Sequence, residues 1–140
     1  GRGAGEGRNL NVPFPPGCGD GDYLTVLEAV VEPELEAYDP DLLLISAGFD
    51  AHEHDPISRM LISTAGYGAL AKRLQEFSER IDAGLAYVLE GGYGLETLSA
   101  GIREVHEVLD GRKPRATSTD PSEDGQNVMA SLGHQGFGSR

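Results

Sequence analysis

Two short, unbroken apolar runs dominate the pattern of the chain, and each is followed by an amphipathic segment. The runs cover residues 42–47 and 85–89. Both are too short for most helices and do not alternate with polar residues, which is typical of strands covered on both faces of a parallel sheet. Apolar residues at three- and four-residue steps then predict helices over residues 64–81 and 95–110. We therefore expect a βαβα unit, and hence an α/β protein with a parallel sheet.

The segments before this unit carry weaker patterns. Residues 9–14 alternate in a way that is consistent with a short strand ending at Pro13. Residues 22–38 have helical periodicity, with Asp22 as the expected N-cap. Pro33 lies inside this span, so we expect the helix to kink or break there.

The character of the sequence changes after residue 111. Small and polar residues dominate residues 112–140, and no apolar period remains. We therefore expect one folded unit over residues 1–111 and a disordered tail over residues 112–140. The chain opens with a glycine-rich run and has neither an initial Met nor the apolar core of a signal peptide. For this reason we also expect it to be a fragment of a longer protein.

Charge and composition exclude several classes of function. The formal net charge is −12, so the chain is expected to repel phosphate and not to bind nucleic acid. No apolar run approaches the ~18–20 residues that a membrane span needs, and no membrane partner is expected. The single cysteine, Cys18, excludes an internal disulfide and favours a reducing compartment. We therefore expect a cytoplasmic location, with the nucleus as the alternative.

Two chemically unusual loops directly follow the two predicted strands. Residues 48–52 follow the first strand, and the glycine-rich residues 90–94 follow the second. Ligands of parallel α/β sheets collect outside the carboxyl ends of the strands. Both loops are therefore expected on the same rim of the sheet, and they will be neighbours if the strands are.

Asp50 and Tyr93 are the candidate functional residues of these loops. A carboxylate in such a crevice needs a cation or hydrogen-bond donors, and aspartate is an accepted ligand of Zn²⁺. The alternative is that Asp50 caps a turn or a helix. A phenol on a glycine-rich turn can donate a hydrogen bond to a developing oxyanion. The alternative is that Tyr93 packs over the edge of the sheet.

A second hypothesis places a complete metal site within residues 50–55. This segment contains Asp50, His52, His54 and Asp55, and extended backbone would point the first two to the same side. The simpler interpretation is that the histidines are solvated loop residues and that Asp55-Pro56 begins a turn.

Taken together, the motifs resemble those of the zinc-dependent histone deacetylase family, closest to its class II and bacterial acetoin-utilisation branch. The matching residues are Gly3-Ala4-Gly5-Glu6-Gly7, Asn9-Leu10-Asn11-Val12-Pro13, Pro40-Asp41-Leu42, Ser46-Ala47-Gly48-Phe49-Asp50-Ala51-His52, Asp55-Pro56 and Leu89-Glu90-Gly91-Gly92-Tyr93. The resemblance covers roughly residues 3–111. It implies that these residues are the C-terminal portion of a parallel-sheet, three-layer domain of the arginase/deacetylase fold.

The resemblance also implies a role for individual residues. Asp50 corresponds to an aspartate ligand of the catalytic Zn²⁺, and Tyr93 to the tyrosine that donates to the carbonyl oxygen during water attack. Ile57 corresponds to a wall of the acyl-lysine tunnel, and its apolar side chain suits an aliphatic lysine stem. His52 corresponds to a recurrent residue that is not a ligand. The implied substrate is the acetylated lysine of a protein or another small acetylated amine.

The remaining parts of the family's catalytic site do not occur in this chain. The family uses an Asp-x-His pair as its other zinc ligands and a His-His pair for acid–base work, and both lie upstream in the family. We therefore expect an incomplete catalytic domain that is inactive alone. The rival hypotheses are a non-catalytic remnant or interaction module, and an unrelated α/β metal hydrolase that uses the Asp50–Asp55 cluster. Nothing in the sequence predicts the oligomeric state.

Overall fold

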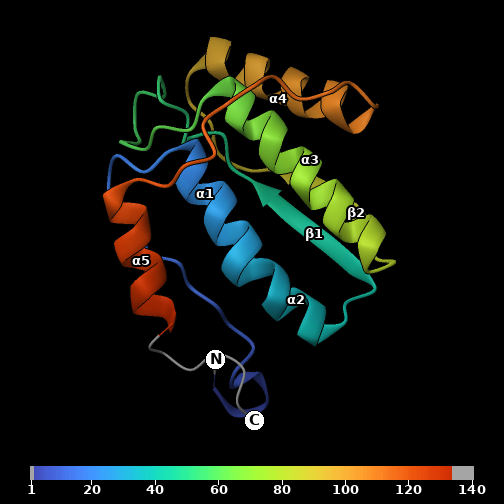
Figure 1. Cartoon of the computed structure of the whole chain (residues 1–140). Coiled ribbons are helices and arrows are strands. Elements are labelled where there is room, and N and C mark those ends of the chain that lie inside the picture. Colours follow the sequence, from blue (N-terminus) through green and yellow to red (C-terminus); the bar gives the residue numbers. More distant parts are fainter. Residues whose placement is uncertain (1, 134–140) are drawn as a thin grey trace.

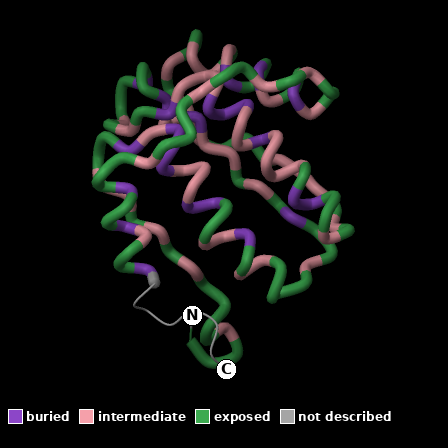
Figure 2. Tube along the Cα trace, in the orientation of Figure 1, coloured by how far each residue is buried: buried purple, intermediate pink, exposed green. Residues whose placement is uncertain are grey.

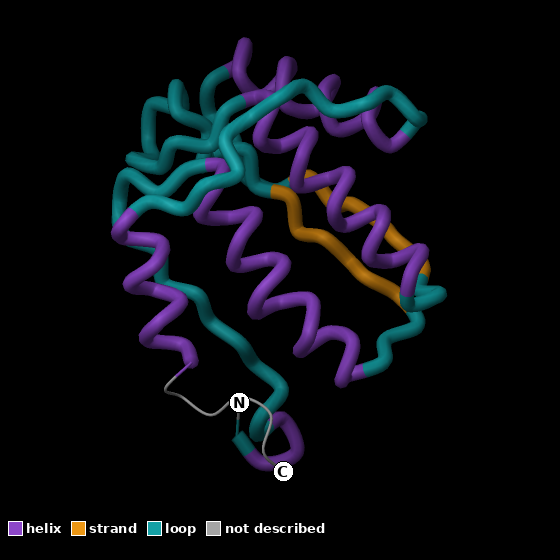
Figure 3. The backbone as a smooth tube through the Cα atoms, in the orientation of Figure 1, coloured by secondary structure: helices purple, strands orange, loops and turns teal. Residues whose placement is uncertain are grey.

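The computed structural model describes residues 2–133, which form helices packed on a small parallel sheet (Figures 1 and 3). In chain order the elements are the 3-10 helix η1 (Gly3–Gly5), α1 (Asp20–Val26), the π-helical η2 (Leu27–Val31), α2 (Glu32–Tyr38), β1 (Leu42–Ala47), α3 (Thr64–Arg80), β2 (Gly84–Leu89), α4 (Leu95–Leu109) and α5 (Glu123–Gly133). None of the helices in the described part of the chain is both long and apolar enough to cross a membrane.

The sheet confirms the predicted βαβα unit. Strands β1 and β2 pair in parallel, with Leu42 opposite Gly84 and Ala47 opposite Leu89. Helix α3 forms the crossover between them, and α4 follows β2 and packs on α3. Helix α3 begins where predicted, because the Ser63 side chain accepts a hydrogen bond from the Gly66 N–H as an N-cap. Both strands end at the same rim of the sheet.

The apolar runs predicted strands that are covered on both faces of the sheet. In the structure one face of the sheet is exposed. Leu43 is buried under the helices, whereas Leu42 and Leu44 are more than half exposed. Val88 of the neighbouring strand lies opposite Ser46, on the same face as Leu44, and is also exposed. Among residues 2–133 no element packs on this bare sheet face, which we define by Leu42, Leu44 and Val88. The apolar pattern therefore predicted the strands correctly and their covering incorrectly.

The helix predicted over residues 22–38 is present but differs in detail. It begins at Asp20, with Gly19 as N-cap, and Asp22 contributes from inside the first turn by accepting a hydrogen bond from the Gly19 N–H at 2.8 Å. The helical residues continue without a gap to residue 38, so of the predicted kink or break at Pro33 the break does not occur, and the helix is π-helical just before the proline. The N–H before the proline, that of Glu32, donates to the carbonyl five residues back. This π-turn adapts the helix to a residue that has no N–H of its own.

The strand predicted over residues 9–14 does not form. This segment runs as an irregular loop before α1 (Figure 3). Phe14 stacks on Tyr23 of α1, with ring centroids 4.7 Å apart. The sheet of the described residues contains only β1 and β2, so this segment has no neighbouring strand with which to pair.

The segment predicted to be a disordered tail is ordered over residues 112–133. Glu104 of α4 has no exposed surface and forms ion pairs with Arg112 and Arg115, each at 2.6 Å. Farther along the chain, two buried carboxylates of α1 accept hydrogen bonds from the segment that follows α4. The Thr117 hydroxyl donates to Asp20, and the Ser122 N–H and hydroxyl donate to the carboxylate of Asp22 at 2.6 and 2.8 Å. Helix α5 follows and packs beside α1 (Figures 1 and 2). The remainder of the predicted tail, residues 134–140, lies outside the described residues.

Candidate functional site

The two loops singled out in the sequence meet at one rim of the sheet, as predicted. The Phe49 N–H donates to the Gly91 carbonyl oxygen at 2.8 Å, and the Glu90 N–H donates to Ala47 at the end of β1 at 3.0 Å. The parallel register carries both strands to this point together. The loop after β1 and the glycine-rich turn after β2 therefore form one surface.

Asp50 lies on this surface, close to the glycine-rich turn. Its side chain is half-buried, and its carboxylate lies between two glycines. A Cβ at Gly48 would come within 2.8 Å of Oδ1 of Asp50, and a Cβ at Gly91 would come within 2.8 Å of its Oδ2. A side chain at either position would displace the carboxylate from this place, so the two glycines permit the observed position of Asp50.

The glycine-rich turn brings Tyr93 to the same rim. Gly92 has a φ of +133°, a conformation that side chains rarely adopt, and a Cβ there would also meet Phe49 and Leu98. Tyr93 follows with a side chain that is 58% exposed. Asp50 and Tyr93 therefore belong to one end of the domain and to directly bonded loops.

Asp55 joins this turn to the loop that carries Ile57. One of its carboxylate oxygens accepts hydrogen bonds from the Tyr93 and Gly94 N–H groups at 2.7 and 3.3 Å. The other oxygen accepts from the Ile57 N–H at 2.9 Å, as expected when an aspartate begins a turn. The Ile57 side chain is exposed at the surface. The predicted turn at Asp55-Pro56 is therefore confirmed, while its bond to Tyr93, 38 residues away, was not predicted.

The electrostatics of Asp55 follow from these donors. Burial by itself raises the pKa of the Asp55 carboxyl, but the N–H groups of Tyr93, Ile57 and their neighbours outweigh burial and lower the pKa below its ordinary value. Asp55 is therefore an ionised, buried acceptor that holds the surrounding backbone.

His52 is a structural residue of this loop. It is 3% exposed, and both nitrogens of its ring have protein partners. Nε2 lies 2.9 Å from the Thr64 hydroxyl, and Nδ1 accepts a hydrogen bond from the His54 N–H at 3.1 Å. Burial lowers the pKa of His52, which favours the neutral ring. Neither nitrogen is free to bind a metal.

The hypothesis of a complete metal site within residues 50–55 is therefore wrong. His52 is engaged with Thr64 and His54, and the oxygens of Asp55 accept backbone N–H groups. Within residues 2–133 no group of three or more His, Cys, Asp and Glu side chains is arranged to hold a metal ion. The unrelated metal hydrolase that would have used this cluster is excluded with it.

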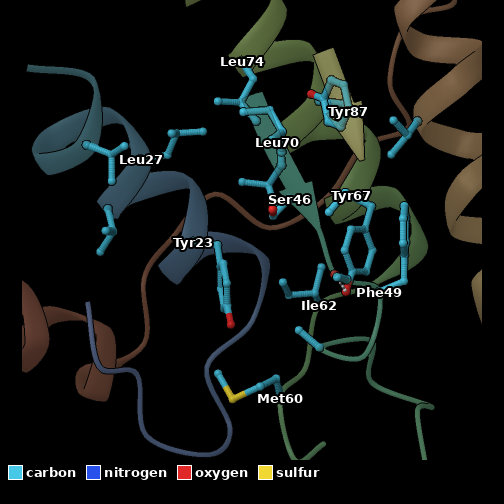
Figure 4. A pocket seen from close by; sticks show the side chains of 18 of the residues that line it. Tyr23, Leu27, Ser46, Phe49, Met60, Ile62, Tyr67, Leu70, Leu74 and Tyr87 are labelled. Atoms are coloured by element: carbon cyan, nitrogen blue, oxygen red, sulfur yellow. Dashed lines mark hydrogen bonds between the residues drawn. The ribbon is translucent and has the colours of Figure 1, made fainter. Parts of the chain in front are cut away.

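A large apolar cavity opens beside the site but does not contain it. It has a volume of about 530 Å³ and lies between the α1–η2 helix, β1 and α3 (Figure 4). Its lining includes Tyr23, Leu27, Phe49, Met60, Ile62, Tyr67, Leu70, Leu74 and Tyr87. Asp50, Ile57 and Tyr93 are not among the lining residues. The candidate site is therefore the surface at the rim of the sheet, and the Tyr67 hydroxyl, which donates to Gly48 at 3.3 Å, lies between the two.

Comparison with known proteins agrees with this fold. The family described as "Histone deacetylase domain" matches residues 1–109, so the chain belongs to the histone deacetylase family. It is 39% identical over 121 residues to histone deacetylase 14, chloroplastic, from Arabidopsis thaliana, and 40% identical over 97 residues to a probable deacetylase from Archaeoglobus fulgidus. These alignments cover 86% and 69% of this chain but only 29% and 27% of the relatives.

Solved structures confirm the fold. The structure of the histone deacetylase Clr3 superposes with a TM-score of 0.85 at 34% identity, over 94% of this chain and 22% of that one. The HDA15 HD domain gives a TM-score of 0.83 at 37% identity, over 96% of this chain and 36% of that one. The described residues thus have the structure of part of a histone deacetylase domain. The cytoplasmic location inferred from Cys18 stays a prediction, and one of the relatives above is named as chloroplastic.

Proposed function

We propose that this chain is part of a zinc-dependent deacetylase and contributes one metal ligand and one oxyanion donor to its site. The reaction is the hydrolysis of the acetyl amide of acetyl-lysine in a protein, or of another small acetylated amine. Membership of the family supports the reaction class. The observation that carries the proposal is the hydrogen bond between Phe49 and Gly91, which brings the loops of Asp50 and Tyr93 together at 2.8 Å.

The described residues fit zinc only in part. The carboxylate of Asp50 has the chemistry of a zinc ligand and a defined place at the carboxyl end of β1. A catalytic zinc ion takes three protein ligands, and residues 2–133 contain no group of three that could supply them. We therefore expect the other two ligands to come from residues outside 2–133. When bound, the ion supplies Lewis-acid activation of the acetyl carbonyl and of water.

Tyr93 and Ile57 contribute through their exposed side chains. The phenol of Tyr93 is free to reach a substrate and donates a hydrogen bond to the carbonyl oxygen as negative charge develops there. Ile57 offers an apolar surface to the aliphatic stem of lysine, and its backbone is fixed by Asp55. The resemblance implies that the general base for the attacking water comes from the family's His-His pair, which lies upstream in the family.

The proposal is tested by comparing this chain with a hybrid enzyme. In the hybrid, residues 2–111 replace the matching segment of histone deacetylase clr3 from Schizosaccharomyces pombe, which is 37% identical to this chain over 115 residues. The chain alone is expected to bind zinc weakly and to leave an acetyl-lysine peptide intact. The hybrid is expected to bind zinc and to deacetylate that peptide. A folded hybrid without turnover would favour a non-catalytic remnant, and tight stoichiometric zinc in the chain alone would contradict the shared site.

The bare sheet face gives a second expected result. Leu42, Leu44 and Val88 present contiguous apolar surface, and β1 and β2 pair only with each other among the described residues. Such a face and such edges promote association. We expect the isolated chain to bind a hydrophobic dye and to self-associate, as measured by fluorescence and light scattering. Replacing Leu44 by Lys is expected to reduce both signals, with the exposed Leu95 of α4 replaced in the same way as the control. A monomer without dye binding would contradict an incomplete sheet.

A further inference from the structure

We propose that Asp55 is a positioning residue for Tyr93, which fixes the place of the phenol relative to Ile57. This inference rests on the proposed function, because it assigns to Asp55 the alignment of two groups that act on the substrate. It concerns a residue that neither holds a metal nor touches the reacting atoms.

The contacts of Asp55 carry the inference. Its side chain is only 7% exposed, and its two oxygens are divided between two segments. One oxygen takes the Tyr93 N–H at 2.7 Å, and the other takes the Ile57 N–H at 2.9 Å. Hydrogen bonds to an ionised carboxylate are shorter and stronger than those to a neutral acceptor. A single rigid group therefore sets the distance between the backbone of Tyr93 and that of Ile57.

The turn that carries Tyr93 depends on such an anchor. Residues 91, 92 and 94 are glycines, which have no side chains to pack and which increase the conformational freedom of the turn. Before Tyr93 the turn is tied to the Phe49 N–H through the Gly91 carbonyl. At Tyr93 and Gly94 it is tied to Asp55. Without the second attachment the backbone of Tyr93 would lose the bond that fixes its direction at the rim.

Asp55 itself is held firmly enough to act as a reference point. Its N–H donates to the His52 carbonyl at 2.8 Å, and His52 is buried against Tyr67 with the rings nearly parallel. The Glu53 N–H donates to the Ile62 carbonyl at 2.9 Å, which closes the loop onto the segment before α3. The anchor is therefore connected to the core, whereas Tyr93 depends on the anchor.

Hydrogen exchange of this chain tests the attachment directly. Replacing Asp55 by Asn keeps the size of the side chain but replaces one acceptor oxygen by an NH₂ group. We expect the exchange of a peptide covering residues 91–95 to accelerate roughly 10- to 100-fold, the range for losing a hydrogen bond to a charged group. Glu53→Gln removes the same charge from the same loop at an exposed position and should leave that exchange unchanged.

A peptide from α3 reports whether the variant is folded. If Asp55→Asn accelerates exchange there as well, Asp55→Ser becomes the test, since its hydroxyl can still accept from the Ile57 N–H in a turn. Accelerated exchange at residues 91–95 with α3 unchanged supports the anchor. Unchanged exchange at residues 91–95 in a folded variant overturns it, whatever the activity of the hybrid.

A double-mutant cycle in the hybrid separates positioning from general damage. Asp55→Asn is expected to lower kcat about 10- to 100-fold, as a small misplacement of a catalytic group can. In a Tyr93→Phe background, where no hydroxyl remains to be placed, the same change should cost less than about threefold because the two effects are not additive. Equal losses in both backgrounds would overturn the positioning role. A Tyr93→Phe variant with full activity would instead contradict the proposed function. In that case the hydrogen-exchange experiment alone would test whether Asp55 anchors the turn of Tyr93.

Discussion

Replacing Tyr93 by Phe in the hybrid is expected to lower kcat by about 10²- to 10³-fold, with KM changed little. The substitution removes one hydroxyl and keeps the ring, so the turn and its bonds to Asp55 should persist. The hydroxyl is assigned to the carbonyl oxygen at the moment when charge accumulates there. Its loss should therefore weaken binding of the transition state more than binding of the substrate. Steady-state kinetics with an acetyl-lysine peptide measure both parameters.

Tyr38 provides a matched control for this substitution. It is 58% exposed, the same fraction as Tyr93, but it ends α2, away from the rim where β1 and β2 end. Tyr38→Phe should leave kcat within about twofold of the unmutated hybrid, as expected for a surface change. A Tyr93→Phe enzyme with normal kcat, or one in which only KM rises, would show that Tyr93 is a binding or packing residue.

Replacing Asp50 by Asn in the hybrid is expected to abolish most of its zinc binding and its turnover. The affinity for zinc should fall by more than the roughly 10- to 100-fold that is lost when a residue hydrogen-bonded to a metal ligand is removed. Asparagine has nearly the same shape, so the tight space between Gly48 and Gly91 is preserved while the negative charge is lost. Titration with zinc against a chelator, followed by metal analysis of the purified protein, gives the change.

The control for this second substitution is Asp41→Asn. Asp41 is exposed and immediately precedes β1, at the end of the strand opposite to the rim. The Asp41→Asn substitution should leave the zinc content and the kcat of the hybrid unchanged. Excess zinc is expected to restore part of the turnover of the Asp50→Asn hybrid if affinity is the main defect. Normal zinc content in that variant would remove Asp50 from the metal site.

The sequence was sufficient to predict the central unit of the fold because the patterns there are local. A run of apolar residues gives β1 its observed bounds, 42–47, and β2 begins one residue before its predicted start. The three- and four-residue steps locate α3 and α4. Since both strands are parallel and neighbouring, their carboxyl ends coincide, and the meeting of the Asp50 and Tyr93 loops follows from topology alone.

The parts that were predicted wrongly depend on distant partners. Residues 112–133 have the composition of a disordered segment, yet buried Asp20 and Asp22 hold them through Thr117 and Ser122. A composition rule does not see hydrogen bonds that span about a hundred residues. The segment 9–14 has the alternation of a strand but finds no strand to pair with among the described residues.

The same distinction applies to the candidate site. The Asp55-Pro56 turn was predictable, because the bond from Asp55 to the Ile57 N–H spans two residues. The bond from Asp55 to Tyr93 spans 38 residues and has no local signature. His52 could not be recognised as structural from its loop, since its partner Thr64 belongs to the next helix. Residue type and spacing identify candidates, and the packing of the rim decides which of them are free to act.

We propose that Asp50 and Tyr93 serve one metal-bound substrate at the rim of the sheet. The most direct test is a crystal structure of the hybrid with zinc and an acetyl-lysine peptide, with the ion located by its anomalous scattering. We expect an ion about 2.0–2.2 Å from an oxygen of Asp50, with the Tyr93 hydroxyl within hydrogen-bond distance of the acetyl oxygen. An ion bound away from Asp50, or an acetyl group out of reach of Tyr93, would contradict it.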